Sequence, residues 1–168
     1  DLQQVLDFVL NQLANVVPHD TSVIELLRDD NLIIIAKRGL LAEATTNEER
    51  ISEFPLDKYP FNKRMILGKT PQLIADLHDD PDWQIIDGHE ALRCAMILPL
   101  IARDEMIGLL NIFSYQVGGF GEQEMQIAAT FGQQAAAAIQ NARFYEQSQH
   151  HTIELEERVA ERTAELKT

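Results

Sequence analysis

The chain has 168 residues, of which 45% are hydrophobic and 24% charged, ordinary values for one globular domain with an extension. Its formal net charge of -13 argues against a nucleic-acid-binding surface, because phosphate contacts need clustered Lys and Arg. A single cysteine, Cys94, excludes an internal disulfide, and the longest apolar run, residues 94–102, is too short to span a bilayer. No basic-then-apolar leader opens the chain, so we expect a cytoplasmic location, with a membrane anchor possible elsewhere in a parent protein.

The first third of the chain predicts one helix and a hairpin. Apolar residues at helical spacing predict a helix over residues 2–17. Thr21 to Arg28 and Leu32 to Lys37 are typical of antiparallel strands, joined by a turn over residues 29–31. The nearly unbroken apolar run over residues 33–36 indicates burial on both faces and hence a central place in the sheet.

The middle of the chain is polar and weakly patterned. We expect a loop over residues 40–58 with at most short elements, and a short helix over Phe61–Leu67 with Gly68 as its C-cap. Residues 72–75 predict a short strand. Residues 76–92 hold the densest polar and aromatic cluster, which predicts a loop with a turn of helix.

The last third predicts two strands and one long helix. The strands cover Ala95–Ala102 and Met106–Tyr115. Gly121, with Glu124 three residues later, can cap a helix that runs over residues 122–168. A helix of that length spans roughly 70 Å, more than a domain built from the remaining residues, so its end must project.

These elements predict an α+β architecture. We expect a mostly antiparallel sheet with the N- and C-terminal helices packed on one face and the loop-rich middle over the other. The domain is expected over residues 1–147, and residues 148–168 are expected to form a projecting signalling helix that leads toward an output domain.

Several stretches resemble one known family, the GAF domains. PLIARDEMIGLLN (99–111) resembles the paired strands of that family. FGEQE (120–124) and QQAAAAIQNARFYE (133–146) resemble the helix that follows those strands. FPLD (54–57) and GKTPQLIAD (68–76) resemble the family's middle section, so the resemblance covers roughly residues 1–147. The tail over residues 155–166 resembles the linker that leads from bacterial sensor modules into PAS or histidine-kinase output domains.

The resemblance implies a GAF-like, PAS-related fold with a five- or six-stranded sheet and a small-molecule pocket. It implies a regulatory module of a two-component sensor histidine kinase, without catalytic residues of its own. The alternative is a structural dimerisation module whose pocket is filled by its own side chains. An enzyme ranks last, because we find no nucleophile–base pair, no Gly-rich phosphate loop and no metal signature.

The family's known cofactors are poorly matched. Bilin-binding members use a Cys that is commonly followed by His, whereas Cys94 is followed by Ala95. Members that reduce free methionine sulfoxide use several cysteines, and one thiol cannot form the resolving disulfide. No motif marks a haem ligand, and the His and Asp residues between His78 and His89 match no metal-ligand spacing. We therefore expect neither bilin, haem nor metal, but an unidentified small molecule.

Eight residues are candidates for the ligand site: Tyr59, Phe61, Asp76, Trp83, His89, Arg93, Cys94 and Asn111. The aromatic members can line a pocket or pack in the core. A cysteine at the start of an apolar strand is by default a small buried hydrophobe. An asparagine inside a strand needs a partner, either the backbone or a ligand.

The long helix also carries a weak heptad pattern. Its seam is formed by Ala135, Ala138, Ala142, Tyr145, Gln149, Thr152, Glu156, Val159, Thr163 and Leu166. A second register uses Leu155, Val159 and Leu166 and places Arg162 in the seam. We expect a homodimer through the terminal helices, in which ligand binding biases one of two packings, and no membrane contact by this chain.

Overall fold

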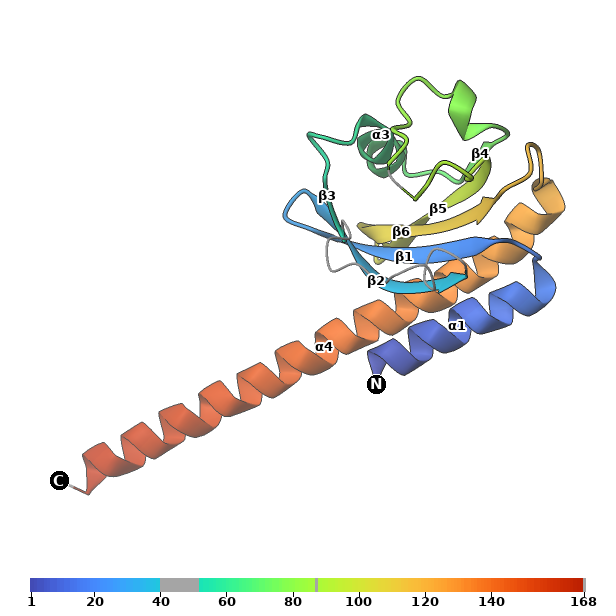
Figure 1. The fold of residues 1–168 in the computed structure, drawn as a ribbon. Coiled ribbons are helices and arrows are strands. Elements are labelled where there is room, and N and C mark those ends of the chain that lie inside the picture. The colour runs from blue at the N-terminus through green and yellow to red at the C-terminus, as the bar shows by residue number, and fades with distance from the viewer. Residues whose placement is uncertain (40–51, 87, 168) are drawn as a thin grey trace.

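The computed structural model describes residues 1–39, 52–86 and 88–167 (Figure 1). The strands are β1 (Thr21–Arg28), β2 (Asn31–Gly39), β3 (Glu53–Pro55), β4 (Gln72–Ile74), β5 (Cys94–Ala102) and β6 (Glu105–Ser114). They form one antiparallel sheet in the order β3-β2-β1-β6-β5-β4. The helices α1 (Leu2–Val16) and α4 (Glu122–Leu166) cover one face, and α3 (Pro60–Gly68) and the 3-10 turn η1 (Leu77–Asp79) lie over the other. This arrangement confirms the expected fold class.

Tight turns set the order of the central strands. The β1–β2 turn has Asp29 and Asp30 at φ 50° and 62°, and the β5–β6 turn has Arg103 and Asp104 at φ 52° and 63°. Two central residues with positive φ give a turn whose twist matches that of the flanking strands. Both turns lie where the sequence predicts them, and each fixes its two strands as antiparallel neighbours.

Side-chain alternation along the strands produces two cores, one on each face of the sheet. In β1, Ile24 and Leu26 point toward α1 and α4, whereas Val23 points to the opposite face. The helix-side core includes Leu6, Leu10, Leu13, Ile24, Cys94, Met96, Leu110, Ile112, Ala128, Ala135 and Ile139. The loop-side core includes Val23, Leu32, Phe54, Phe61, Leu77, Ile97, Leu109 and Phe113.

Two details of the first two thirds differ from the prediction. β2 is not central: it lies between β1 and the three-residue strand β3, and Ile33, Ile34 and Ile35 are only half-buried. An apolar run therefore shows neither how many strands lie beside a strand nor how fully its two faces are covered. The C-cap of α3 is Lys69, at φ 54°, and Gly68 is the last helical residue. The predicted loop over 40–58 contains β3, and its residues 40–51 lie outside the described part of the chain.

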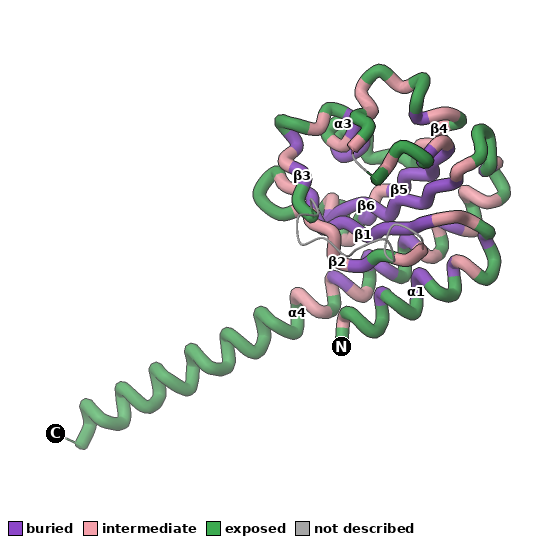
Figure 2. The backbone as a smooth tube through the Cα atoms, in the orientation of Figure 1, coloured by how far each residue is buried: buried purple, intermediate pink, exposed green. Residues whose placement is uncertain are grey.

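The helix α4 is continuous over 45 residues, or about 68 Å. Its predicted cap is present, since the Gly121 N–H donates to Glu124 Oε2 at 3.0 Å. Its buried residues, Ala128, Gly132, Ala135, Ala136 and Ile139, all lie in its first half. Residues 144–167 are exposed and project from the body (Figure 2). Ala135 therefore belongs to the helix-side core and cannot open a dimer seam.

No helix in the described part of the chain is both long and apolar enough to cross a membrane.

Candidate functional site

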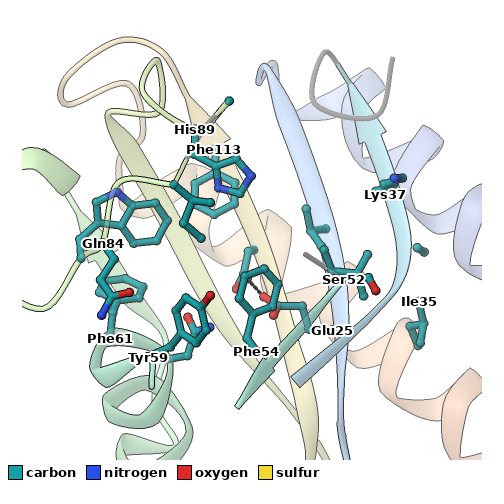
Figure 3. Close-up of a pocket in the computed structure, with 18 of the residues that line it drawn as sticks. Glu25, Ile35, Lys37, Ser52, Phe54, Tyr59, Phe61, Gln84, His89 and Phe113 are labelled. Carbon is teal, nitrogen blue, oxygen red and sulfur yellow. Dashed lines mark hydrogen bonds between the residues drawn. The ribbon is translucent and has the colours of Figure 1, made fainter. Parts of the chain in front are cut away.

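A cavity of about 540 Å³ lies between the sheet and the loop-rich layer (Figure 3). Its floor consists of side chains from β1, β2 and β6: Val23, Glu25, Ile34, Asn111 and Phe113. Its other side consists of Phe54 from β3 and of Tyr59 and Phe61 at the start of α3. Trp83, Ile86 and His89 complete it, and they belong to residues 80–86 and 88–89, which we call the covering segment. The cavity continues around β2, where Lys37 and, from α1, Gln3 and Asp7 border it.

Aromatic rings form most of the apolar wall. Phe54 and Tyr59 contact edge to face, with ring centroids 5.0 Å apart, and Phe61 and Trp83 do the same at 5.0 Å. Trp83 also lies 6.0 Å from Phe113. Such contacts add to the stability that ring burial provides and hold each ring in place. The rings thus connect β3, α3, the covering segment and β6 around one space.

A buried polar pair lies in the floor of this apolar space. Glu25 is only 4% exposed and Asn111 6%, and Asn111 Nδ2 donates a hydrogen bond to Glu25 Oε1, drawn as a dashed line in Figure 3. Their strands are neighbours, with Val23 opposite Asn111, and both side chains point to the same face. A bulge in the β1–β2 pairing between Ile24 and Glu25 adjoins the pair. Burial raises the pKa of Glu25 to about 7, although the bond from Asn111 acts in the opposite direction.

Three buried polar atoms of the cavity's lining residues have no hydrogen-bond partner among the described residues. They are Glu25 Oε2, Asn111 Oδ1 and Trp83 Nε1. A buried donor or acceptor without a partner costs about 1–3 kcal/mol, so native proteins keep few of them. Two acceptors and one donor on residues that line a single cavity are groups that a bound molecule with complementary groups would satisfy.

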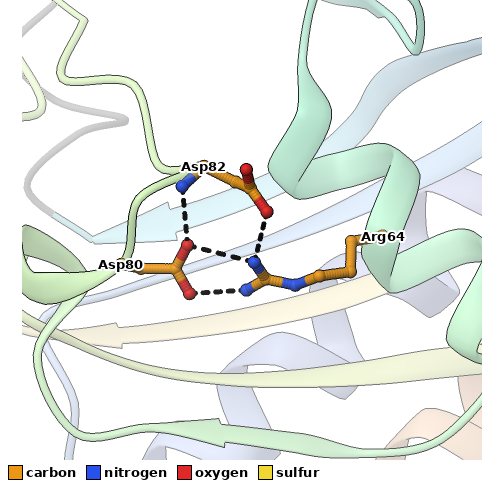
Figure 4. Close-up of polar contacts among 3 residues, drawn as sticks. All are labelled: Arg64, Asp80 and Asp82. Atoms are coloured by element: carbon orange, nitrogen blue, oxygen red, sulfur yellow. Dashed lines mark hydrogen bonds and ion pairs between the residues drawn. The ribbon is translucent and has the colours of Figure 1, made fainter.

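The segment that carries Trp83 is fixed to α3 by charge (Figure 4). Arg64 Nη2 lies 2.5 Å from Asp80 Oδ2, and Arg64 Nη1 lies 2.5 Å from Asp82 Oδ2. The Asp82 N–H donates to Asp80 Oδ1 at 2.9 Å. Burial alone would raise the pKa of Asp80, but its bonds to Arg64 and to the Asp82 N–H lower it. We call these three residues the Arg64 latch.

The candidate residues fall into two groups. Tyr59, Phe61, Trp83, His89 and Asn111 all line the cavity.

Asp76, Arg93 and Cys94 lie outside it. Arg93 donates to both carboxylate oxygens of Asp76, at 2.9 and 2.7 Å, and this bond lowers the pKa of Asp76 to about 2. That pair joins the residue before η1 to the residue before β5. Cys94 points into the helix-side core and is fully buried, because the first residue of β5 faces α1 and α4.

The sequence interpretation missed Glu25, and it expected the backbone or a ligand as the partner of Asn111, where the structure shows a carboxylate. A signal was available: Glu25 is a charged residue between Ile24 and Leu26 in a strand that is otherwise apolar at its centre. A carboxylate at an inward-facing strand position indicates a special environment. Within the described residues, no group of three or more His, Cys, Asp or Glu is arranged to hold a metal ion.

Comparison with known proteins identifies the family. The GAF domain model matches residues 1–140. The GAF domain of a phosphoenolpyruvate-protein phosphotransferase from Coxiella burnetii is similar at a TM-score of 0.74 and 22% identity, covering 88% of this chain and 87% of that chain. A GAF domain/HD domain protein from Geobacter sulfurreducens gives 0.73 and 17%, with 86% and 95% covered.

The fold also occurs in enzymes. Free methionine-R-sulfoxide reductase from Neisseria meningitidis, solved in complex with its substrate, is similar at a TM-score of 0.69 and 16% identity, covering 86% of this chain and 81% of that chain. At such identities the similarity concerns the fold alone. A search of curated proteins gave no significant match. The family match spans most of the sequence, and the sheet order and helix placement agree with the solved structures: the chain belongs to the GAF domain family, whose members are generally regulatory or sensory.

Proposed function

We propose that this chain is the small-molecule-sensing module of a bacterial signal-transduction protein of the sensor histidine kinase type. The observation that carries the proposal is the cavity: about 540 Å³, walled by aromatic rings, with three buried polar atoms that lack partners among the described residues. A concave, mostly apolar site with a few convergent polar groups is the usual form of a small-molecule site. The Neisseria reductase, a protein of the same fold, holds its own substrate, which supports the idea that this fold accommodates small ligands.

We propose a regulatory role and not a catalytic one. The only cysteine, Cys94, lies in the helix-side core, on the opposite face of the sheet from Glu25 and Asn111. The polar pair in the cavity, Glu25 and Asn111, contains no thiol, hydroxyl or amine nucleophile, and the Glu25 carboxyl group is bonded to Asn111. We therefore propose that the site binds a ligand and does not react with it.

We further propose that the chain pairs with a second copy through its terminal helices. Large apolar side chains are exposed on both: Val5, Phe8 and Val16 on α1, and Phe144, Tyr145, Ile153, Leu155 and Val159 on α4. Exposed apolar stripes on a projecting helix are typical of helix pairing. In this view the paired α4 helices carry the state of the pocket to an output domain in the same protein. A module that only dimerises, with no ligand, remains the alternative.

A ligand search with a blocked-pocket variant tests the sensing proposal. Native mass spectrometry of freshly purified protein reports a co-purified small molecule, and a thermal-shift screen against a metabolite library reports others. Val23→Phe places a ring in the cavity, and Ile153→Phe, on the exposed part of α4, is the matched control. We expect ligands that raise the Tm of the wild type and of Ile153→Phe, but not of Val23→Phe. Shifts that are equal in all three proteins, or no bound molecule by either method, contradict the proposal.

A further inference from the structure

The floor of the cavity contains an ionisable group where an amide would serve as well. A glutamine at position 25 would also accept a hydrogen bond from Asn111, without the cost of burying a carboxylate. Instead Glu25 is fully buried, and its second oxygen, Oε2, has no partner among the described residues. A carboxylate at this position binds its partner more strongly than an amide would only when that partner is a cation.

The surroundings of Glu25 also favour a cation. Asn111 presents a second unpartnered acceptor, Oδ1, beside the carboxylate that its Nδ2 holds. The faces of aromatic rings attract cations, and five rings line the cavity: Phe54, Tyr59, Phe61, Trp83 and Phe113.

An anionic ligand would find few basic side chains in the described part of the cavity. The basic side chains that line the described part of the cavity are Lys37 and His89. Lys37 is exposed, and Figure 3 shows it on β2, on the far side of the view from Phe61 and Tyr59. His89 is half-buried in the covering segment and already has an interaction partner.

We propose that the pocket binds an aromatic or apolar small molecule that carries a protonated amine, whose N–H groups donate to Glu25 Oε2 and Asn111 Oδ1. The inference rests on the proposed sensing function and specifies its ligand class. An ammonium has three donors and no acceptor, which matches two acceptors on residues that are bonded to each other. The Trp83 Nε1–H adds one donor for an oxygen elsewhere on the same molecule.

The protonation of Glu25 makes such binding depend on pH. In the empty pocket its pKa is about 7, so at pH 6 a bound ammonium must first displace a proton. An alkylammonium keeps its own charge well above pH 8. Other ionisable groups that border the cavity are Asp7 from α1, Lys37 from β2, Tyr59 before α3, and Asp82 and His89 from the covering segment.

Three indole probes of similar shape and different charge test the inference on the full chain. They are tryptamine (cation), tryptophol (neutral) and indole-3-propionate (anion), compared by calorimetry at pH 8. We expect tryptamine to bind about tenfold more tightly than tryptophol, because hydrogen bonds to charged groups are the stronger ones, and indole-3-propionate to bind most weakly. The affinity for tryptamine should rise about tenfold between pH 6 and pH 8.

Variants test whether Glu25 causes the preference for tryptamine and its pH dependence. Glu25→Gln should remove both the preference for tryptamine and its pH dependence, whereas Glu161→Gln, on the exposed part of α4, should keep both. If tryptophol or indole-3-propionate binds as tightly as tryptamine, or the preference survives in Glu25→Gln, the pocket still senses small molecules but the assigned ligand class is wrong. If none of the three probes binds, the assigned ligand class is contradicted, whereas the sensing proposal is decided separately by the ligand search with Val23→Phe. The probe series needs only the wild-type protein, so it decides even if Glu25→Gln does not fold.

Discussion

At the scale of single residues, Glu25 lowers the stability of the folded chain, although it supplies an acceptor for the proposed ligand. Its carboxyl group is buried among Val23, Ile34 and the cavity's rings, and its only hydrogen bond from a described residue comes from Asn111. Burying an ionisable group destabilises the folded state unless the group is neutral or well paired. The folded protein therefore keeps Glu25 protonated at pH values where the unfolded chain ionises it.

The pH dependence of stability follows from this difference. The pKa of Glu25 is about 7 in the folded state and near 4.5 in the unfolded state. Below pH 4.5 the group is protonated in both states and costs nothing. Between pH 4.5 and 7 the unfolded state binds fewer protons, so the free energy of unfolding falls as pH rises, by on the order of 3 kcal/mol in all. Above pH 7 the loss is complete and constant.

Glu25→Gln should abolish this part of the pH profile, because glutamine cannot ionise but still accepts from Asn111. We expect urea denaturation at pH 4.5, 6 and 8 to show wild type losing stability relative to Glu25→Gln across the series. Glu161→Gln, on the exposed part of α4, should follow the wild type. Parallel profiles for wild type and Glu25→Gln would mean that Glu25 is ionised and paired in the folded state.

At the scale of elements, the sequence predicted the positions of most strands but only some of the residues that line the cavity. Apolar runs and turn residues located β1, β5 and β6, and a cap with helix-forming residues located α4, to within about two residues, because strands that are buried on both faces are apolar almost throughout. The same pattern could not show that β2 lies next to a three-residue edge strand. Tyr59, Phe61 and Trp83 were candidates because aromatic residues stand out in a polar segment. Val23 and Phe113 look like core residues, and only the three-dimensional arrangement shows an open space beside them.

The Arg64 latch gives the covering segment a specific role in positioning Trp83. Arg64→Ala removes the bonds from α3 to Asp80 and Asp82. Arg64 is 41% exposed, so the free energy of unfolding should fall by only about 1 kcal/mol or less. Trp83, the only tryptophan, should become more mobile, with a red-shifted emission and stronger quenching by acrylamide.

Arg158→Ala is the matched control, because it breaks an ion pair with Glu154 at 2.8 Å on the exposed part of α4. Its fluorescence should equal that of the wild type. An unchanged Trp83 signal in Arg64→Ala would show that the contacts with Phe61 and Phe113 hold the ring without the latch.

Replacing either of two glycines that pack against the sheet with alanine should change stability in opposite directions. A Cβ at Gly132 of α4 would lie 3.7 Å from Leu100 Cδ2, an ordinary contact. Gly132→Ala should therefore stabilise the fold by up to about 1 kcal/mol, through better helix propensity. A Cβ at Gly108 of β6 would lie 1.9 Å from the backbone oxygen of Glu25, so Gly108→Ala should destabilise it by about 3 kcal/mol. Chemical denaturation of both variants checks the signs; a destabilising Gly132→Ala would mean that α4 packs closer than described.

At the scale of the whole molecule, one continuous path joins the pocket to the projecting helix. β6 carries Asn111 and Phe113 in the cavity, and the β5–β6 turn carries Arg103. The Arg103 guanidinium lies 4.4 Å from the ring centroid of Phe144, where α4 becomes exposed. In the proposed relay, a shift of β6 on ligand binding would reach the base of the stalk, the exposed part of α4 over residues 144–167, through the β5–β6 turn. Such coupling needs two packings of the stalk that differ by only a few kcal/mol.

Removal of residues 148–168 separates the body from the stalk. The part of the stalk over residues 148–167 is exposed along its length and buries no side chain in either core, so the shortened chain should keep the Tm of the monomeric body. If the stalks pair, light scattering should show the full chain as a dimer and the shortened chain as a monomer at the same concentration. Leu155→Glu combined with Val159→Glu in the full chain should have the same effect, because two charges in a helix seam oppose pairing. A shortened chain that remains dimeric would place the contact on α1, where Phe8 is 61% exposed, and would leave the stalk without a role in holding the copies together.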